Sequence, residues 1–208
     1  MRGNLILLEG LDRSGKSTQA ELLAGHLDAT LIKFPDRSTP IGKLINEYLT
    51  NSEFHLSDEA AHLLFSANRW ELAAKIEKLI ANGTNVVLDR YVYSGIAYSL
   101  AKEGLKSREW LYSPDKGLPK PDLTIFLIIL MEELARRKGW GEERYEQTAF
   151  QEKVKKCFLE ILRPEEDNSV VLVNVDRLLI EQTRDTVWRA IAENSLDLPK
   201  KTPLNRFT

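Results

Sequence analysis

Five short runs of apolar residues recur along the chain, and longer amphipathic stretches separate them. The runs are Leu5–Leu8, Leu31–Phe34, Val86–Leu88, Leu123–Ile129 and Val170–Val173. Apolar residues fill nearly every position of each run, which is typical of strands that are buried on both faces. The alternation of such strands with helical stretches predicts an α/β fold, in which a five-stranded parallel sheet is flanked by helices on both faces.

The length and charge of the chain limit its organisation and its partners. A chain of 208 residues is expected to form one domain, 1–208. Its 29 Lys and Arg residues nearly balance 31 Asp and Glu residues, whereas nucleic acids and anionic membranes attract a basic surface. We therefore expect no nucleic-acid partner and no membrane partner.

Cellular location is suggested by what the sequence lacks. No apolar stretch is long enough for a signal peptide or a membrane span. Cys157 is the single cysteine, so it has no partner for an intramolecular disulfide, and we expect it to be a small buried apolar residue. These features predict a cytoplasmic protein, with the nucleus or another organelle left open.

A glycine-rich segment lies between the first predicted strand and a predicted helix, Ser17–Leu27. The segment reads GLDRSGKS from Gly10 to Ser17 and fits the pattern GxxxxGK[ST]. Glycines allow backbone N–H groups to surround phosphate oxygens, and the helix N-terminus adds partial positive charge. In such a loop Lys16 reaches the β- and γ-phosphates and Ser17 can hold Mg²⁺. The segment predicts a P-loop NTPase fold, but by itself it does not separate kinases from switch proteins, motors or transporter ATPases.

The end of the third predicted strand offers a carboxylate and a cation. Asp89 stands where a carboxylate orients the magnesium shell, directly or through water. Arg90 follows it, at the carboxyl end of a strand, where ligands of open α/β sheets bind. The alternative is that Asp89 caps the next helix.

A cation interrupts an apolar stripe in the segment HLLFSANRWELAAKIEKLI. At helical spacing the stripe consists of Phe65, Leu72, Ile76 and Leu79 or Ile80, and Arg69 falls inside it. Burying an unpaired guanidinium is costly, so Arg69 either pairs with a carboxylate, extends to solvent or points into a ligand site. In a ligand site, Phe65 and Arg69 would suit a flat ring that carries carbonyl oxygens.

Other polar residues are harder to interpret from the sequence. Arg37 follows the second strand, near a turn made by prolines, and either clamps a phosphate or is a solvated turn arginine. The three histidines, His26, His55 and His62, show neither triad partners nor metal-ligand spacing. We expect no role for them.

Six segments together resemble thymidylate kinases of the eukaryotic type, a family of P-loop nucleoside monophosphate kinases. They are GLDRSGKSTQ, FPDRSTPIG, HLLFSANRWE, DRYVYSGIAYS, GLPKPDL and GEERYE, and the resemblance extends from Gly10 to about Phe158. It implies transfer of the γ-phosphoryl group of ATP to dTMP, giving dTDP and ADP, with Mg²⁺. It also implies a homodimer and a mobile lid at about 136–147. The tail, about 196–208, lies outside the resemblance.

The resemblance also assigns roles to individual residues. The donor phosphates would be held by Gly10, Arg13, Ser14, Gly15, Lys16, Ser17 and Thr18, and Mg²⁺ by Ser17 and Asp89. The acceptor site would consist of Asp12, Phe34, Arg37, Phe65, Arg69, Arg90, Ser94, Gly95, Tyr98, Tyr145 and Gln151. In it, Phe65 would stack on thymine, Arg69 would bond the carbonyl edge of thymine, and Arg37 and Arg90 would grip the phosphate.

Phosphoryl transfer requires two anions held in line and neutralisation of the developing charge. Catalytic roles would accordingly fall to Asp12, Arg13, Lys16 and Arg90, and a base is not required because the acceptor phosphate is already ionised. We expect Arg13 to supply the transition-state cation. The alternative is a cation of the lid, namely Arg136, Arg137, Lys138 or Arg144.

Two other functions remain open from the residues alone. A deoxynucleoside kinase would phosphorylate a sugar hydroxyl, and would need a carboxylate base and fewer phosphate-binding arginines. A nucleotide-dependent switch or an ATP-binding interaction module would not be an enzyme of this kind. The chain lacks the Asn-Lys-x-Asp and Leu-Ser-Gly-Gly-Gln segments of their commonest forms.

Overall fold

A parallel sheet of five strands forms the centre of the molecule in a computed structural model, which describes residues 1–208 except 103, 105–106, 137–142, 195 and 197–198. The strands are β1 (Leu5–Gly10), β2 (Thr30–Lys33), β3 (Val86–Asp89), β4 (Leu123–Ile128) and β5 (Val170–Asn174), in the spatial order β2-β3-β1-β4-β5. All five predicted strands are confirmed, with ends shifted by one or two residues. Buried side chains fill every position of β1 and β3, as the continuous apolar runs require.

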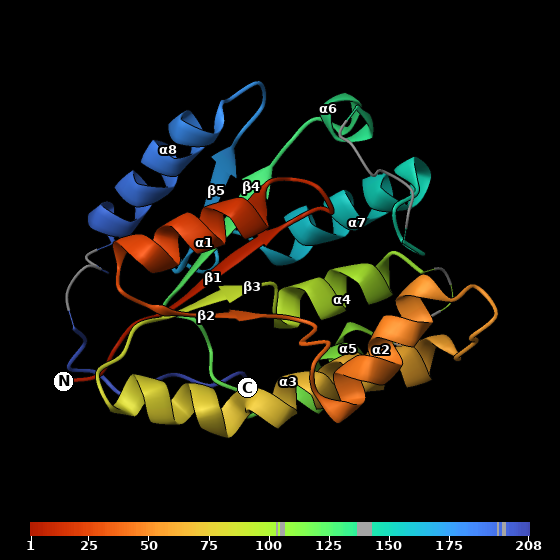
Figure 1. The fold of residues 1–208 in the computed structure, drawn as a ribbon, viewed down its shortest axis with the longest axis horizontal. Helices are drawn as coiled ribbons and strands as arrows, with labels where there is room; N and C mark the ends of the chain where they lie inside the picture. The colour runs from red at the N-terminus through yellow and green to blue at the C-terminus, as the bar shows by residue number, and fades with distance from the viewer. Residues whose placement is uncertain (103, 105–106, 137–142, 195, 197–198) are drawn as a thin grey trace.

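Helices cover both faces of this sheet (Figure 1). They are α1 (Lys16–His26), α2 (Pro40–Thr50), α3 (Asp58–Ala81), α4 (Val92–Leu100), α5 (Arg108–Tyr112), α6 (Met131–Ala135), α7 (Thr148–Ile161) and α8 (Ile180–Glu193), with a 3₁₀ turn at Ser113–Asp115. One face is covered by α1 and α8, and the other by α3, α4 and α7. The α/β fold is therefore confirmed, and the helix after the glycine-rich loop begins at Lys16, one residue earlier than expected.

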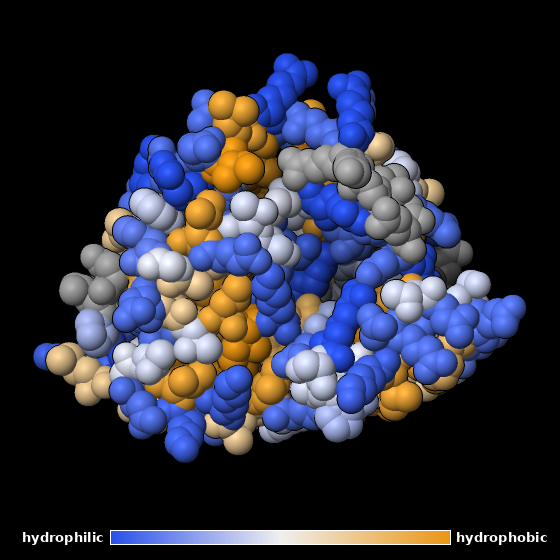
Figure 2. Space-filling model, in the orientation of Figure 1, coloured by the Kyte–Doolittle hydropathy of each residue, from blue (hydrophilic) through white to orange (hydrophobic). Residues whose placement is uncertain are grey.

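The strand order places a binding crevice at one edge of the sheet. From β1 the chain crosses to β2 and returns through β3, and it then crosses β1 to reach β4 and β5. Ligands of open α/β sheets bind at such a reversal, outside the carboxyl ends of the strands. On this face a hollow opens beside the ends of β1 and β3, bordered by hydrophilic side chains (Figure 2).

The C-terminal tail pairs with the body of the protein. Arg206 forms an antiparallel bridge with Pro119, and Lys200 forms another with Arg2 near the N-terminus. The Phe207 side chain is buried and packs against the rings of Tyr91 and Tyr93. The tail thus supports the segment that follows β3. The sequence did not predict this contact, because the tail has no periodic pattern.

Two smaller expectations can be compared with the fold. Cys157 is a free thiol, partly rather than fully buried, and packs against the main core. Within the described residues, no helix is both long and apolar enough to cross a membrane.

Candidate active site

The glycine-rich loop wraps around the N-terminus of α1. Gly15 has a φ of +92°, a left-handed conformation that favours glycine, and Arg13 adopts φ +62°. Lys16 is buried, and its Nζ donates to the carbonyl oxygen of Leu11 at 3.2 Å. Burial, and then the positive charge of Arg90, lower the pKa of Lys16 to about 8. The loop therefore holds a cation against a helix N-terminus, an arrangement that requires an anion.

Asp89 is the last residue of β3 and is buried beside this loop. Its Oδ1 atom has no hydrogen-bond partner among the described residues. The alternative role as a helix cap is not observed, because Tyr91, and not Asp89, is the N-cap residue of α4. An unsatisfied buried carboxylate oxygen next to Lys16 fits a hydrated Mg²⁺ better than a purely structural role.

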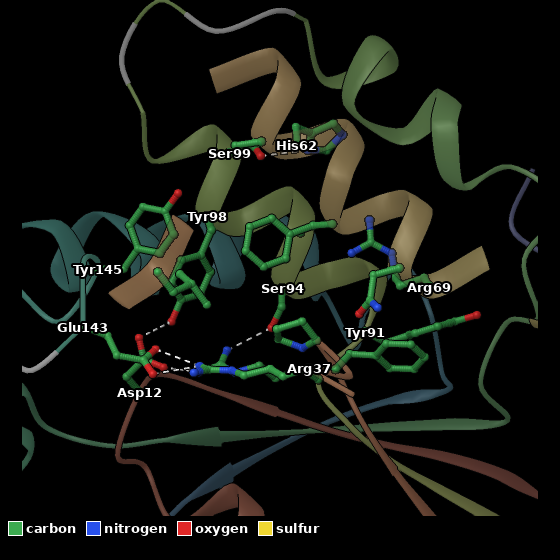
Figure 3. Close-up of a pocket in the computed structure, with 18 of the residues that line it drawn as sticks. Asp12, Arg37, His62, Arg69, Tyr91, Ser94, Tyr98, Ser99, Glu143 and Tyr145 are labelled. Atoms are coloured by element: carbon green, nitrogen blue, oxygen red, sulfur yellow. Dashed lines mark hydrogen bonds and ion pairs between the residues drawn. The ribbon is translucent and has the colours of Figure 1, made fainter. Parts of the chain in front are cut away.

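A pocket beside the loop brings the predicted acceptor residues together (Figure 3). Its lining includes ten of them: Asp12, Phe34, Arg37, Phe65, Arg69, Arg90, Ser94, Gly95, Tyr98 and Tyr145. Asp12, Glu143 and Arg37 gather at the side near the sheet, whereas His62 and Ser99 lie at the opposite end (Figure 3). The pocket therefore combines charged side chains near the P-loop with the aromatic rings of Phe65, Tyr98 and Tyr145.

Arg69 pairs with a carboxylate and also lines the pocket, so two of the three possibilities hold at once. Its Nε and Nη2 donate to the two carboxylate oxygens of Asp115, at 3.0 and 2.6 Å. Ser66 donates to the same carboxylate at 2.7 Å. A Cβ atom on Gly95 would lie 2.8 Å from Nη1 of Arg69, so α4 approaches the guanidinium as closely as a glycine allows. Together these contacts fix Arg69 in one orientation.

Asp12 joins the P-loop to the acceptor pocket. Its carboxylate accepts hydrogen bonds from Arg90, from the Tyr98 hydroxyl at 2.8 Å and from Gln151 Nε2 at 2.7 Å. Burial favours the neutral acid, but the positive charges of Arg90 and Lys16 outweigh it and hold the pKa of Asp12 below its ordinary value. Gln151, the eleventh predicted acceptor residue, thus reaches the pocket through Asp12 and Tyr98.

Ser94 links Arg90 to an acid that the sequence did not indicate. The hydroxyl of Ser94 accepts from Nη1 of Arg90 at 3.0 Å and donates to the buried carboxylate of Glu9. Ser94, which the resemblance places beside thymine, lines the pocket, and its hydroxyl is engaged in this chain of hydrogen bonds. Glu9 lies in β1 among apolar residues. The sequence pattern there predicts a buried strand and gives no sign of a role for the acid.

Two carboxylates of the predicted lid pair with arginines that we expect to bind phosphate. Arg37 donates to both oxygens of Glu143, at 2.8 and 3.0 Å, and Arg13 Nε contacts Glu146 at 3.0 Å. Both arginines are thus paired with acidic groups. The lid positions 137–142, which include Arg137 and Lys138, lie outside the described residues, and Arg136 is exposed.

Arg144 is directed away from the donor site. Its guanidinium donates to the carbonyl oxygens of Tyr48, Asn51 and Phe54 at 2.8 to 3.0 Å, and lies over the Tyr48 ring. It fastens residues 143–146 to the end of α2. Of the alternative lid cations, Arg144 is therefore a structural clamp here.

His62, for which we expected no role, lies in the wall of the acceptor pocket. Its Nε2 is 2.8 Å from the carbonyl oxygen of Leu111, and its Nδ1 is 2.8 Å from the Ser99 hydroxyl. Burial is the main cause that lowers the pKa of His62. The carbonyl requires a proton on Nε2, so a neutral imidazole accepts from Ser99 through Nδ1. Asn68 and Lys102, two other lining residues, were also not anticipated.

Comparison with known proteins identifies the family. The family model described as thymidylate kinase matches residues 8–187. The chain belongs to the thymidylate kinase family. Among its relatives, human thymidylate kinase is 42% identical over 99% of this chain and 97% of its own length. Thymidylate kinase from Schizosaccharomyces pombe is 50% identical over 84% of each chain.

Solved structures of the family show the same fold. A thymidylate kinase from Candida albicans is 54% identical, covers 100% of this chain and 99% of its own, and superposes with a TM-score of 0.96. The family resemblance that the six segments indicated is therefore confirmed, and the fold with it. The individual roles that the resemblance assigned to site residues stay predictions.

Proposed function

We propose that the protein transfers the γ-phosphoryl group of ATP to dTMP, giving dTDP and ADP, in dTTP biosynthesis. Membership of the family supports this reaction. The observation that carries it is the Asp12–Arg90 ion pair, because it joins a phosphate-binding loop to a pocket that suits a nucleoside monophosphate. A donor at the loop and an acceptor in the pocket would meet at this pair.

The donor phosphates would occupy the loop Gly10–Ser17, with Thr18 at the start of α1. Backbone N–H groups and Lys16 would hold the β- and γ-phosphates. Arg13 would reach the transferring group, since it leaves the loop in a left-handed conformation and contacts the lid side through Glu146. Arg13 is in our proposal the transition-state cation.

The acceptor would lie with its base away from the P-loop. Phe65 would stack on thymine while Arg69, fixed by Asp115, would donate to a carbonyl oxygen of the base. Arg37 and Arg90 would hold the phosphate, which would replace Glu143 on Arg37. Tyr98 and Tyr145 would border the sugar, and Tyr98 would crowd a ribose 2′-hydroxyl.

Mg²⁺ would be held by Ser17 and Asp89 together with nucleotide phosphates and water. Across the described residues no cluster of three or more His, Cys, Asp or Glu side chains could hold a metal on its own. Magnesium in such enzymes typically uses one or two protein ligands and the phosphates of the substrate. It would neutralise charge on the β- and γ-phosphates.

The reaction itself needs little covalent help from side chains. An oxygen of the acceptor phosphate forms a bond to the γ-phosphorus, while the bond from that phosphorus to the bridging oxygen breaks and ADP leaves with the electron pair. The side chains of Arg13, Arg37, Arg90 and Lys16 would keep the two anions in line and offset their repulsion. Asp12 would keep Arg90 in place between them.

An acceptor panel tests this proposal directly. ADP formation is followed in a coupled assay that contains ATP and Mg²⁺. The acceptors compared are dTMP, thymidine, dUMP, ribothymidine 5′-monophosphate and dGMP. We expect rapid turnover with dTMP and none with thymidine. Turnover with thymidine but not with dTMP would show a deoxynucleoside kinase instead.

Assembly and location are further parts of the proposal. The protein would act as a homodimer, and the exposed side chains of Leu63 and Trp70, seven residues apart on α3, would offer an apolar stripe to a second copy. Light scattering on a size-exclusion column measures the mass directly. The cytoplasmic location stays a prediction, which microscopy of a tagged protein tests.

A further inference from the structure

Glu9 is a fully buried acid in the central strand of the sheet. Its exposed fraction is 0%, and it pairs in the sheet with Phe126 of β4. A carboxylate in such surroundings is costly unless donors surround it. The residue therefore requires a physical reason beyond packing.

The carboxylate of Glu9 caps the N-terminus of α4. Its Oε1 accepts from the backbone N–H groups of Tyr91 and Ser94, each at 3.0 Å. The first turn of α4 has no acidic residue, and its N-cap residue makes no side-chain bond in the described structure. Glu9 thus satisfies two of the N–H groups that a helix start leaves unpaired, from a strand that is remote in sequence.

Capping alone does not explain the charge. A neutral glutamine could accept the same two N–H groups through its amide oxygen. The second carboxylate oxygen, Oε2, accepts the Ser94 hydroxyl, so all three contacts of Glu9 are with donors. Burial raises the pKa of Glu9, whereas the charge of Arg90 and the hydrogen bonds from Ser94 and Tyr91 act in the opposite direction. The three donors suit the ionised acid, in which the proton of Ser94 points at Glu9.

The direction of that proton determines how Ser94 meets Arg90. Because the single hydroxyl proton is given to Glu9, a lone pair of Ser94 Oγ faces Nη1 of Arg90, which donates at 3.0 Å. Nη2 of the same guanidinium donates to Asp12. The chain Glu9–Ser94–Arg90–Asp12 holds Arg90 at both of its terminal nitrogens, while the backbone of Arg90 is held at a φ of +66°.

We propose that Glu9 is a positioning residue for phosphoryl transfer: through the Ser94 hydroxyl, its buried carboxylate orients the guanidinium of Arg90 between the acceptor pocket and the P-loop. Glu9 does not touch either nucleotide. The proposal rests on the proposed function, in which Arg90 holds the acceptor phosphate.

A pair of variants separates positioning from capping. Glu9→Gln keeps an acceptor for the two backbone N–H groups but removes the charge that directs Ser94. Ser94→Ala keeps the Glu9 carboxylate and both backbone N–H groups but removes the hydroxyl. We expect each single variant to lower kcat for dTMP at least tenfold, with KM for ATP changed less than twofold, and the double variant to be no slower than the slower single variant.

The outcomes distinguish this proposal from the proposed function. Turnover of dTMP by the unmodified protein is measured first, and its absence would overturn the proposed function and the role of Glu9 with it. With an active protein, a kcat within twofold of the original for Ser94→Ala would overturn the proposal even if Glu9→Gln did not fold. Multiplied losses in the double variant would also overturn it, since two independent structural effects would then act.

Discussion

Arg69 and Asp115 form a buried, two-pronged ion pair in the wall of the acceptor pocket. The two side chains are 3% and 0% exposed. The pair explains how a guanidinium can interrupt the apolar stripe of α3, because Asp115 supplies its counter-charge from the turn that follows α5. Two nitrogens of Arg69 are used in this way, so the ion pair fixes its orientation toward the pocket.

Removing the charge of Asp115 should therefore affect both stability and acceptor binding. Asp115→Asn leaves the buried Arg69 without a counter-ion, and breaking such pairs costs about 3 kcal/mol of unfolding free energy. We also expect KM for dTMP to rise at least tenfold, while KM for ATP stays within twofold. Urea unfolding and steady-state kinetics measure the two effects.

A matched control breaks an exposed ion pair in the same way. Glu77→Gln removes the contact with Arg206, where both side chains are solvent-accessible. Such pairs contribute about 0–1 kcal/mol. Equal losses of stability in Asp115→Asn and Glu77→Gln would show that the buried pair has no special role.

Gly95 should tolerate no larger side chain. An added Cβ would lie 2.8 and 2.9 Å from two nitrogens of Arg69, so Gly95→Ala should push the guanidinium aside and raise KM for dTMP at least fivefold. Gly25→Ala is the control, because a Cβ there meets nothing within 4 Å and lies in helix α1. We expect it to leave kinetics unchanged and to raise stability by up to about 1 kcal/mol. An unchanged KM for dTMP in Gly95→Ala would mean that binding of dTMP does not depend on the observed position of Arg69.

Glu143 should compete with the acceptor phosphate for Arg37. Because the phosphate must replace the carboxylate, Glu143→Gln is expected to lower KM for dTMP about two- to fivefold, as for loss of a partly exposed ion pair. Glu152→Gln, an exposed acid on α7, is the charge-matched control. A raised KM in Glu143→Gln alone would indicate instead that Glu143 orients Arg37 for the phosphate.

The lowered pKa of Lys16, about 8, predicts a pH dependence of donor binding. Above pH 8 the ligand-free protein loses the Lys16 proton, and binding of phosphates must restore it. Affinity for Mg²⁺–ATP should thus fall by up to tenfold per pH unit above pH 8 and be flat near pH 7. Calorimetry at pH 8.5–9 in two buffers of different ionisation enthalpy should show uptake of nearly one proton. Equal heats in the two buffers would contradict the prediction.

The features that sequence could reveal are those with a local pattern. Gly10–Ser17 was recognisable from spacing alone, and Arg69 was recognisable because a cation broke a helical apolar stripe. The five strands followed from continuous apolar runs. Each of these signals lies within one segment of the chain.

The features that sequence missed depend on contacts between distant segments. Asp115 meets Arg69 across 46 residues, and Glu9 meets Ser94 across 85. Phe207 packs under Tyr91 from a tail that has no periodic pattern. Neither an acid in a strand nor an aromatic residue in a tail has a local sequence pattern that identifies its partner. These contacts are therefore visible only in the folded structure.

The central claim is that two nucleotides meet at the Asp12–Arg90 pair. A crystal structure of the protein with dTMP and a non-hydrolysable ATP analogue tests it most directly. We predict the dTMP phosphate on Arg37 and Arg90, thymine beside Phe65 and Arg69, and the analogue's γ-phosphate facing the acceptor phosphate from the loop Gly10–Ser17. Binding of dTMP outside this pocket would contradict the claim. An intact Arg37–Glu143 ion pair at saturating dTMP, with no phosphate on Arg37, would also contradict it.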